Sequence, residues 1–500
     1  GYIVGDTLII AALDLGTGSS AATIVLTAGD IVEGDPAFTL EAIDKGEIWN
    51  NTGSITSGSL DSGSADNVRW QIAGRNESSG TFSLIIRRGN DTTNNPVVLE
   101  QYNNLSLDPN QPNFISAVIG DNKFNYNSAE NYLEISGSYA NGSRYVRVKK
   151  VNKPTPNYLD NAGNAQDQFT GSIPALGSGS IGGAFQAGVG SLITSIAGGG
   201  NYYEEAGTGA SAVTQGLVST DYNNMLNLLS NQDDYRFNAL LTPGLIDKVH
   251  ASQTTTAINN TQGRGDSIYI LDPVLYGSTI ATTTGQANAR NTSYAAVYWP
   301  WLQTFEPDSG KNVWIPASTM IGGVYAFNDN VSEPWFAPAG INRGGLTNVI
   351  RPERKLSQAN RDTLYEANVN PIASFPGTGT VVYGQKTLQR QASALDRVNV
   401  RRLLIALKSY ISQIGQTLVF EQNTAATRNN FLAAVNPYLE TVQQRQGLYA
   451  FKVVMDDSNN TPDVIDRNQL IGAIYLQPTR TAEFIYLDFN VLPTGATFPA

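Results

Sequence analysis

The last third of the chain, residues 374–500, has a pattern that few folds accommodate. A strand-like run at residues 380–383 precedes two helical segments, and three further strand-like runs follow them. Gly, Pro or Asn stands at the joins, where turns are expected. This order predicts a C-terminal α/β core, in which two long helices accompany a mixed sheet.

The two helical segments differ in how clearly they are bounded. The first, residues 394–414, has apolar side chains at three- and four-residue spacing, which predicts an amphipathic helix. Ser393 is a suitable N-cap and Gly415 a suitable stop. The second begins near Asn423 and contains Pro437. Because proline lacks the helical N–H and clashes with the preceding turn, we expect a kink or a split there.

The first helical segment also concentrates positive charge. Its cations, which we call the basic ridge, are Arg397, Arg401, Arg402 and Lys408. Against the single anion Asp396 they give the segment a net charge of +3, whereas the whole chain carries −11. Two interpretations stay open: an ordinary solvated helix face, or a contact surface for an acidic partner.

The last strand-like run, residues 482–491, is partly apolar on both faces. One face carries Ile485, Leu487, Phe489 and Val491, and the other carries Phe484, Tyr486, Asp488 and Asn490. As a free edge this run would invite pairing with other chains, since little Lys or Pro protects it. We therefore expect it to lie inside the sheet or to be completed by a neighbouring chain.

The first 215 residues follow a different period. Short alternating runs, such as residues 82–87, stand between clusters of Gly, Asn, Asp and Ser, which predicts a β-rich sandwich or barrel. Residues 171–200 are dense in Gly and Ser. The run at residues 177–183 resembles a phosphate-binding loop only superficially, because no Lys-Ser/Thr pair follows it, and a linker is the simpler interpretation.

Helical spacing first appears after residue 216, with Asp221 as a suitable cap. Helical and strand-like segments then alternate, which predicts a βαβ-type layer. We expect His250 at the C-terminal end of a helix over residues 245–250, where a cation suits the helix dipole. The chain is thus predicted to be a multidomain α+β and α/β protein. The predicted divisions are a β-rich region at 1–160, part of which is assigned alternatively to the middle domain, a Gly/Ser-rich connection at 161–215, a middle α/β domain at 216–350 and the C-terminal core at 351–500.

The composition leaves few chemical sites. The chain has no cysteine and one histidine, which removes thiolate sites and most acid–base constellations. An acidic cluster at residues 456–466 lacks the central Gly and terminal Glu of an EF-hand, so a turn is favoured over a calcium site. The net charge argues against a general nucleic-acid binder, and no run of about 18 apolar residues predicts a membrane span. We predict no catalytic residue, metal or cofactor.

The second half resembles the tail sheath proteins of contractile-tailed bacteriophages. The similar stretches are NALLTPG at 238–244, SYAAVYWPW at 293–301, EPWFAPAG at 333–340, FEQNTAATR at 420–428 and LPTG at 492–495. The resemblance covers residues 221–500 and is thin over the first 160. Members of the family begin with an extended arm that lends a strand to a neighbour. The start of this chain does not resemble that arm, so we expect the arm to be missing.

The resemblance implies a structural protein of the phage tail, assembled in the cytoplasm of the host bacterium. Copies would stack as rings, usually hexameric, around a tail tube and contract to drive the tube through the host envelope for genome ejection. The implied partners are other copies, the tail tube protein, and the baseplate and tail terminator proteins, with no nucleic acid and no membrane insertion. The β-rich region would protrude and the C-terminal core would face the tube. The basic ridge would then contact the tube, and residues 484–491 would pair between subunits.

Other functions stay open on the residues alone. A carboxylate-based glycoside hydrolase needs a matched pair of acidic side chains, and no pair stands out. A β-rich adhesin could use the Asn/Gly-rich first third. The adhesion tripeptide Arg264-Gly265-Asp266 is better explained as a turn. Within the family, the sheath of a phage-tail-like bacteriocin or of a secretion apparatus is the alternative.

Overall fold

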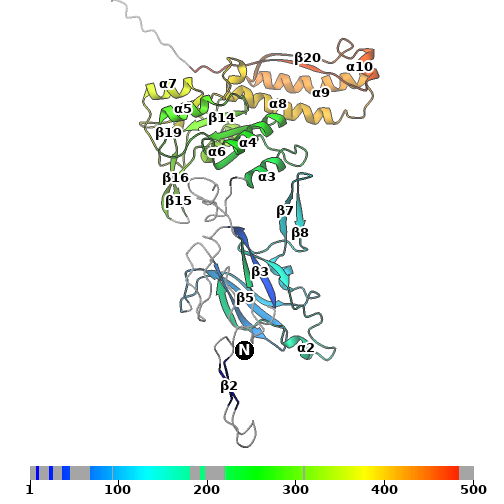
Figure 1. The fold of residues 1–500 in the computed structure, drawn as a ribbon. Helices are drawn as coiled ribbons and strands as arrows, with labels where there is room; N and C mark the ends of the chain where they lie inside the picture. The colour runs from blue at the N-terminus through cyan, green and yellow to red at the C-terminus, as the bar shows by residue number, and fades with distance from the viewer. Residues whose placement is uncertain are drawn as a thin grey trace, which may run out of the picture. The chain divides into compact units, whose positions relative to one another are not determined.

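The computed structural model describes residues 7–10, 22–25, 37–45, 68–92, 94–180, 192–196, 219, 221–307 and 310–483. The chain divides into two compact units, Gly1–Leu229 and Ser230–Ala500. The first is drawn in blue to cyan-green and the second in green to red in Figure 1. Both sheets and helices are present, as predicted. No helix in the described ranges is long and apolar enough to cross a membrane.

The first unit is built mainly from strands. They are β1 (Thr7–Ile10), β2 (Ala22–Val25), β3 (Phe38–Lys45), β4 (Val68–Asn76), β5 (Thr81–Arg88), β6 (Val98–Ser106), β7 (Lys123–Asn127), β8 (Tyr132–Ser136), β9 (Val146–Val151), β10 (Gly177–Ser180) and β11 (Leu192–Ile196). The helices are α1 (Ile115–Ile119), α2 (Asp167–Thr170) and α3 (Asp221–Leu228). The predicted β-rich character of this part of the chain is confirmed.

Two sheets share the core of the first unit. One has the order β10-β4-β5-β6 and the other β11-β3-β9, while β1–β2 and β7–β8 form separate hairpins. Alternate side chains of β4 and β5, such as Trp70 and Leu84, are buried together. Phe38 of β3 stacks on Phe82 of β5 with 5.5 Å between ring centroids. The Gly/Ser run predicted as a linker begins with β10, which pairs with β4, and residues 181–183 lie outside the described ranges.

The second unit is organised around a five-stranded sheet. Its strands, in spatial order, are β12 (Ala239–Ile246), β13 (Ile268–Asp272), β14 (Ala295–Trp299), β18 (Val369–Phe375) and β19 (Gly379–Val382). The first four run parallel and β19 is antiparallel. Every residue of β13 and β14 is buried, as expected for parallel strands covered on both faces.

Helices connect and cover this sheet. They are α4 (Ala251–Arg264), α5 (Ile280–Asn288), α6 (Ser318–Val331) and α7 (Gln358–Glu366). A smaller antiparallel sheet has the order β16-β15-β17, with β15 (Leu302–Glu306), β16 (Lys311–Ile315) and β17 (Arg351–Pro352). The predicted domain boundary at residue 350 falls inside the large sheet. A long crossover separates β14 from its neighbour β18 in the sequence. The last two strands of the sheet, β18 and β19, therefore come after residue 350, and the sheet ends at residue 382.

The C-terminal part adds a helix pair and a hairpin. It contains the short 3-10 helix η3 (Ala394–Asp396), α8 (Val398–Gln416), α9 (Ala425–Gln444), β20 (Leu448–Val454), α10 (Pro462–Asp466) and β21 (Ala473–Pro478). Ser393 caps η3, not the long helix, and α8 runs past Gly415. The predicted split at Pro437 is not found. Val435 and Leu439, which flank it, are fully buried, and this packing holds α9 together.

The predicted position of His250 is wrong. Strand β12 continues through a turn at Gly244, whose φ is +95°, to the buried Ile246. The next helix, α4, begins only at Ala251, so His250 lies at a helix N-terminus. Its Nδ1 accepts a hydrogen bond from the backbone N–H of Ile246 at 3.0 Å, which requires an unprotonated nitrogen. The imidazole therefore has a structural role.

A buried carboxylate caps α6 across the sheet. Asp272, at the end of β13, accepts hydrogen bonds from the backbone N–H of Ser318 at 3.0 Å and from its hydroxyl. Burial raises the pKa of Asp272 to about 7, and the two bonds from Ser318 oppose this shift only in part. Between the ordinary carboxyl pKa and about 7, the folded state therefore holds a proton that the unfolded state has lost.

This assignment predicts that stability depends on pH through Asp272. Since the folded pKa is the higher one, raising the pH from about 5 to about 8 should destabilise the protein. Asp272→Asn keeps an acceptor for the Ser318 N–H but does not titrate, so its melting temperature should fall less over this range. Asp272→Ala should lose about 1–3 kcal/mol at the acid end of this range, where the wild-type carboxyl is protonated, and the loss should shrink as the pH rises. If the melting temperatures of the wild type and Asp272→Asn change by the same amount over this pH range, the assignment is contradicted.

Candidate functional site

Helix α8 lies between two hydrophobic cores. Val398 and Ile405 belong to the core of the central sheet, together with Ile270 of β13. Leu403 and Leu407 belong to a second core, which α9, β20 and β21 complete. The first half of α8 is therefore buried around its whole circumference, and the predicted division into one apolar stripe and one solvated face is wrong there.

Two members of the basic ridge are buried. Arg401 and Arg402 are each 5% exposed. The Arg401 guanidinium lies 3.9 Å from the centroid of the Tyr294 ring, and its Nε donates to the carbonyl of Ser293 at 3.2 Å. Burial lowers the pKa of Arg401. Arg402 donates to both carboxylate oxygens of Asp329 on α6. These two cations attach α8 to the sheet and to α6.

The other two members remain at the surface to different degrees. The Lys408 side chain is exposed, although its Nζ donates to the carbonyl of Arg264 at 2.7 Å. Arg397 is partly exposed and pairs with Asp396 at 3.0 Å and with Glu483 at 2.7 Å. The basic ridge is thus not a continuous exposed surface, because most of its members bind partners inside the subunit.

The adhesion tripeptide also turns inward. Arg264 is 3% exposed and pairs with Asp266 at 2.8 Å, while its guanidinium lies 4.2 Å from the Phe237 ring centroid. The guanidinium that a receptor would have to bind is therefore covered, which agrees with the turn interpretation.

A tryptophan from the segment that follows α6 also packs in the second core. Trp335, in the segment after α6, packs in the same core as Phe431 and Leu439 of α9. The indole N–H of Trp335 donates to the carbonyl of Arg445 at 2.9 Å. The backbone carbonyl of Trp335 accepts a hydrogen bond from the Asn399 side chain of α8 at 3.3 Å. The two halves of this unit therefore interlock: α8 enters the core of the sheet, and Trp335 enters the core of the helix pair.

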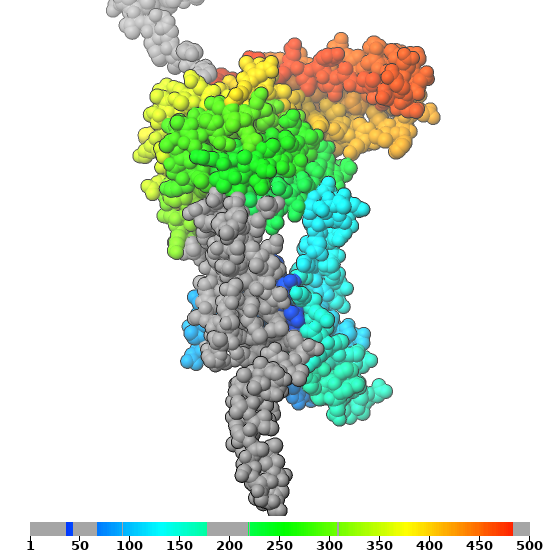
Figure 2. Space-filling view, in the orientation of Figure 1, coloured from blue at the N-terminus to red at the C-terminus, as the bar shows by residue number. Residues whose placement is uncertain are grey.

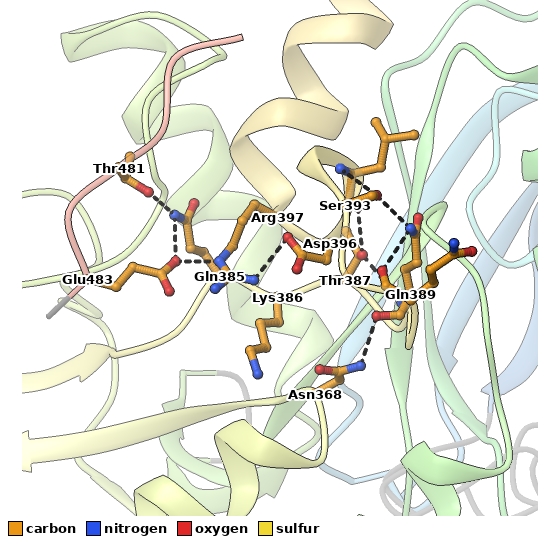
Figure 3. A network of polar contacts seen from close by, with 12 residues as sticks. Asn368, Gln385, Lys386, Thr387, Gln389, Ser393, Asp396, Arg397, Thr481 and Glu483 are labelled. Atoms are coloured by element: carbon orange, nitrogen blue, oxygen red, sulfur yellow. Dashed lines mark hydrogen bonds and ion pairs between the residues drawn. The ribbon is translucent and has the colours of Figure 1, made fainter.

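A polar cluster surrounds Glu483, the last described residue. Its carboxylate accepts from Arg397 Nε at 2.7 Å, from Gln385 Nε2 at 3.1 Å and from the Tyr365 hydroxyl at 2.8 Å. Gln385 also donates to the hydroxyl of Thr481 at 2.5 Å. Figure 3 shows Arg397 and Gln385 turned toward this carboxylate and the Thr481 hydroxyl turned toward the Gln385 amide. Burial, reinforced by the charge of Glu483, raises the pKa of Tyr365, so the phenol remains a donor.

The predicted inter-subunit strand, residues 484–491, lies outside the described residues. The described part of this region holds a two-stranded sheet, β20–β21, with one unpaired edge on each strand. One face packs on α9, while Tyr449 and Tyr475 are 63% and 62% exposed. In Figure 2 the orange and red residues of α9, β20 and β21 project beyond the green and yellow body of the same unit.

The acidic loop between β20 and β21 is closed by its own contacts. Asp456 accepts from the backbone N–H of Ser458 at 2.8 Å, and Asp457 pairs with Arg428 of α9 at 2.6 Å. Among the described residues, no group of three or more His, Asp or Glu side chains is placed to hold a metal ion. Asp456 and Asp457 are therefore bound within the subunit, and α10 spans part of the loop.

Two family models match this chain in sequence. The phage tail sheath protein central domain matches residues 219–388, and the phage tail sheath C-terminal domain matches residues 390–492. Together they cover more than half of the 500 residues. Their junction falls between β19 and α8, the helix that joins the two cores.

Relatives agree with these matches. The tail sheath protein of Vibrio phage KVP40 is 40% identical over 250 residues, which are 49% of this chain and 36% of that protein. The tail sheath protein of Enterobacteria phage T4 is 40% identical over 208 residues, which are 42% of this chain and 32% of that protein. The matched part of the chain thus spans about a third of the length of these relatives.

Among solved structures, a similar one is the contracted sheath complex of an extracellular contractile injection system. It shares 26% identity over 55% of this chain and 75% of that chain, with a TM-score of 0.47. The two consecutive domain matches and the two 40% identical relatives confirm the resemblance that the motifs at 238–244 and 293–301 indicated. The chain belongs to the phage tail sheath family.

Proposed function

We propose that this chain is a structural subunit of a contractile tail sheath in the phage virion. The observation that supports the proposal is the match to the central and C-terminal sheath domains, in order, across one interlocked unit. Copies assemble in the host cytoplasm as stacked rings around a tail tube. Contraction then drives the tube through the host envelope for genome ejection. This role is mechanical and requires no catalytic group.

The packing of the second unit suits mechanical work. Separating the helix pair from the central sheet would expose two cores at once, because α8 contributes side chains to both and Trp335, which follows α6, packs in the core of the helix pair. Exposure of apolar area costs about 25 cal/mol per Å². Contraction therefore changes the contacts between copies and leaves each second unit intact as a rigid body.

The partners follow from the same proposal. They are other copies of the chain, the tail tube protein, the baseplate and the tail terminator protein, with no nucleic acid or membrane insertion. For contact between copies, residues 484–491 pair with a free edge of β20–β21 in a neighbour, at ~0.5–1.5 kcal/mol net per hydrogen bond. For the tube, we retain Lys408, because its side chain is exposed. Arg397, Arg401 and Arg402 act inside the subunit.

Assembly of the full-length protein tests the proposal directly. Electron microscopy of the purified protein should reveal tubes of stacked rings, because the outer edges of β20 and β21 have no partner strand among the described residues and can pair with a neighbour. A protein that stays monomeric over a wide range of salt concentrations would contradict the proposal.

The two kinds of basic side chain should respond differently to charge reversal. Lys408→Glu should weaken decoration of tail tubes and lower the melting temperature only slightly, because the side chain is exposed and its loss removes one hydrogen bond, to the carbonyl of Arg264. Arg401→Glu should instead destabilise the subunit by about 3–5 kcal/mol, because it places an unpaired carboxylate in a buried site.

Lys355→Glu is the matched control, since Lys355 is exposed, stands between β17 and α7 rather than on α8, and changes the net charge equally. Decoration can be measured by co-sedimentation with purified tubes. If Lys408→Glu and Lys355→Glu decorate tubes equally well, Lys408 is not a tube contact.

A further inference from the structure

We propose that Glu483 is a positioning residue, which fixes the point where the C-terminal segment leaves the subunit. Together with Tyr365, Gln385 and Arg397 it forms a cluster that we call the Glu483 anchor. The inference rests on the proposed function, in which the following residues pair with a neighbouring copy. By this inference, the four residues of the Glu483 anchor hold the start of the segment that pairs with the neighbour.

The anchor gathers three parts of the fold on one carboxylate. Tyr365 belongs to α7, Gln385 follows β19, and Arg397 is the residue before α8. All three donate to Glu483 at 2.7–3.1 Å. Its side chain is only 16% exposed, so these charge-assisted bonds are shielded from water and from salt.

The chain is tied down at several points before it reaches the anchor. After β21, the backbone N–H and the hydroxyl of Thr479 donate to the carbonyls of Gly447 and Gln446 at 3.2 and 2.7 Å. Thr481 then accepts from Gln385 at 2.5 Å. The segment therefore runs from the turn between α9 and β20, where Thr479 is bound, to Gln385 beside the central sheet. Thr481 and Glu483 both bind Gln385 there (Figure 3).

This arrangement determines where a pulling force acts. Without the anchor, tension on residue 484 would first detach residues 479–483 and then separate β21 from β20 one hydrogen bond at a time. With the anchor, tension passes from Glu483 to α7, which packs on β18 through the buried Leu364, and to α8 and the sheet, which share a core. A fixed origin also reduces the conformational freedom that the segment loses when it pairs with a neighbour.

The test uses the full-length protein with Glu483→Gln and Glu483→Ala. Both should lower the melting temperature by only a few degrees, because Glu483 lies outside the two cores and only the bonds of the anchor are lost. Trypsin cleavage after the exposed Arg480, followed by mass spectrometry, should become about tenfold faster, since cleavage requires local opening of residues 479–483. Assembled tubes should become shorter and break during contraction. Glu440→Gln, on the exposed face of α9, is the charge-matched control and should behave as wild type.

The outcomes separate this inference from the proposed function. If the wild type forms no tubes, the proposed function fails, while cleavage after Arg480 still reports on the anchor. If the wild type assembles, and both Glu483 variants match it in cleavage rate, tube length and survival of contraction, the anchor does not exist. Faster cleavage with unchanged tubes would also overturn the positioning role, because the segment would then need no fixed origin.

Discussion

The packing of α8 against two cores is the constraint on which the rest of the second unit depends. Ile405 completes the core of the parallel sheet, and Leu407 completes the core of the helix pair. Two buried cations of α8 add polar contacts to this packing: Arg401 lies over the Tyr294 ring, and Arg402 donates to Asp329 of α6. A helix that is shared in this way cannot move relative to either neighbour without exposing apolar surface and unpairing buried charges.

Much of this fold could be predicted from local patterns. The strands β13 and β14 are continuous apolar runs, and α8 has regular helical spacing, so their existence follows from periodicity alone. The basic ridge could not be interpreted correctly in the same way. The partners of Arg401 and Arg402 lie 108 and 73 residues away in the sequence, and charge by itself favours a solvated face.

Other differences have similar causes. The domain boundary was predicted at residue 350, whereas strand pairing carries the sheet to residue 382. His250 was assigned to a helix end because the turn at Gly244 looked like a strand end, but β12 resumes after it. The polar cluster at Glu483 has no sequence signal, since its four residues come from separate segments. Sequence thus predicts elements well, and contacts between distant elements poorly.

In the proposed function, each subunit works through contacts with its neighbours, so its interior must transmit force without yielding. The interlocked cores and the Glu483 anchor describe one path for that force, from the C-terminal segment into the buried body. Cryo-electron microscopy of the assembled sheath before and after contraction tests this account most directly. The account predicts that residues 230–483 superpose as one body in the two states. A rotation of α8 and α9 relative to the five-stranded sheet would contradict it.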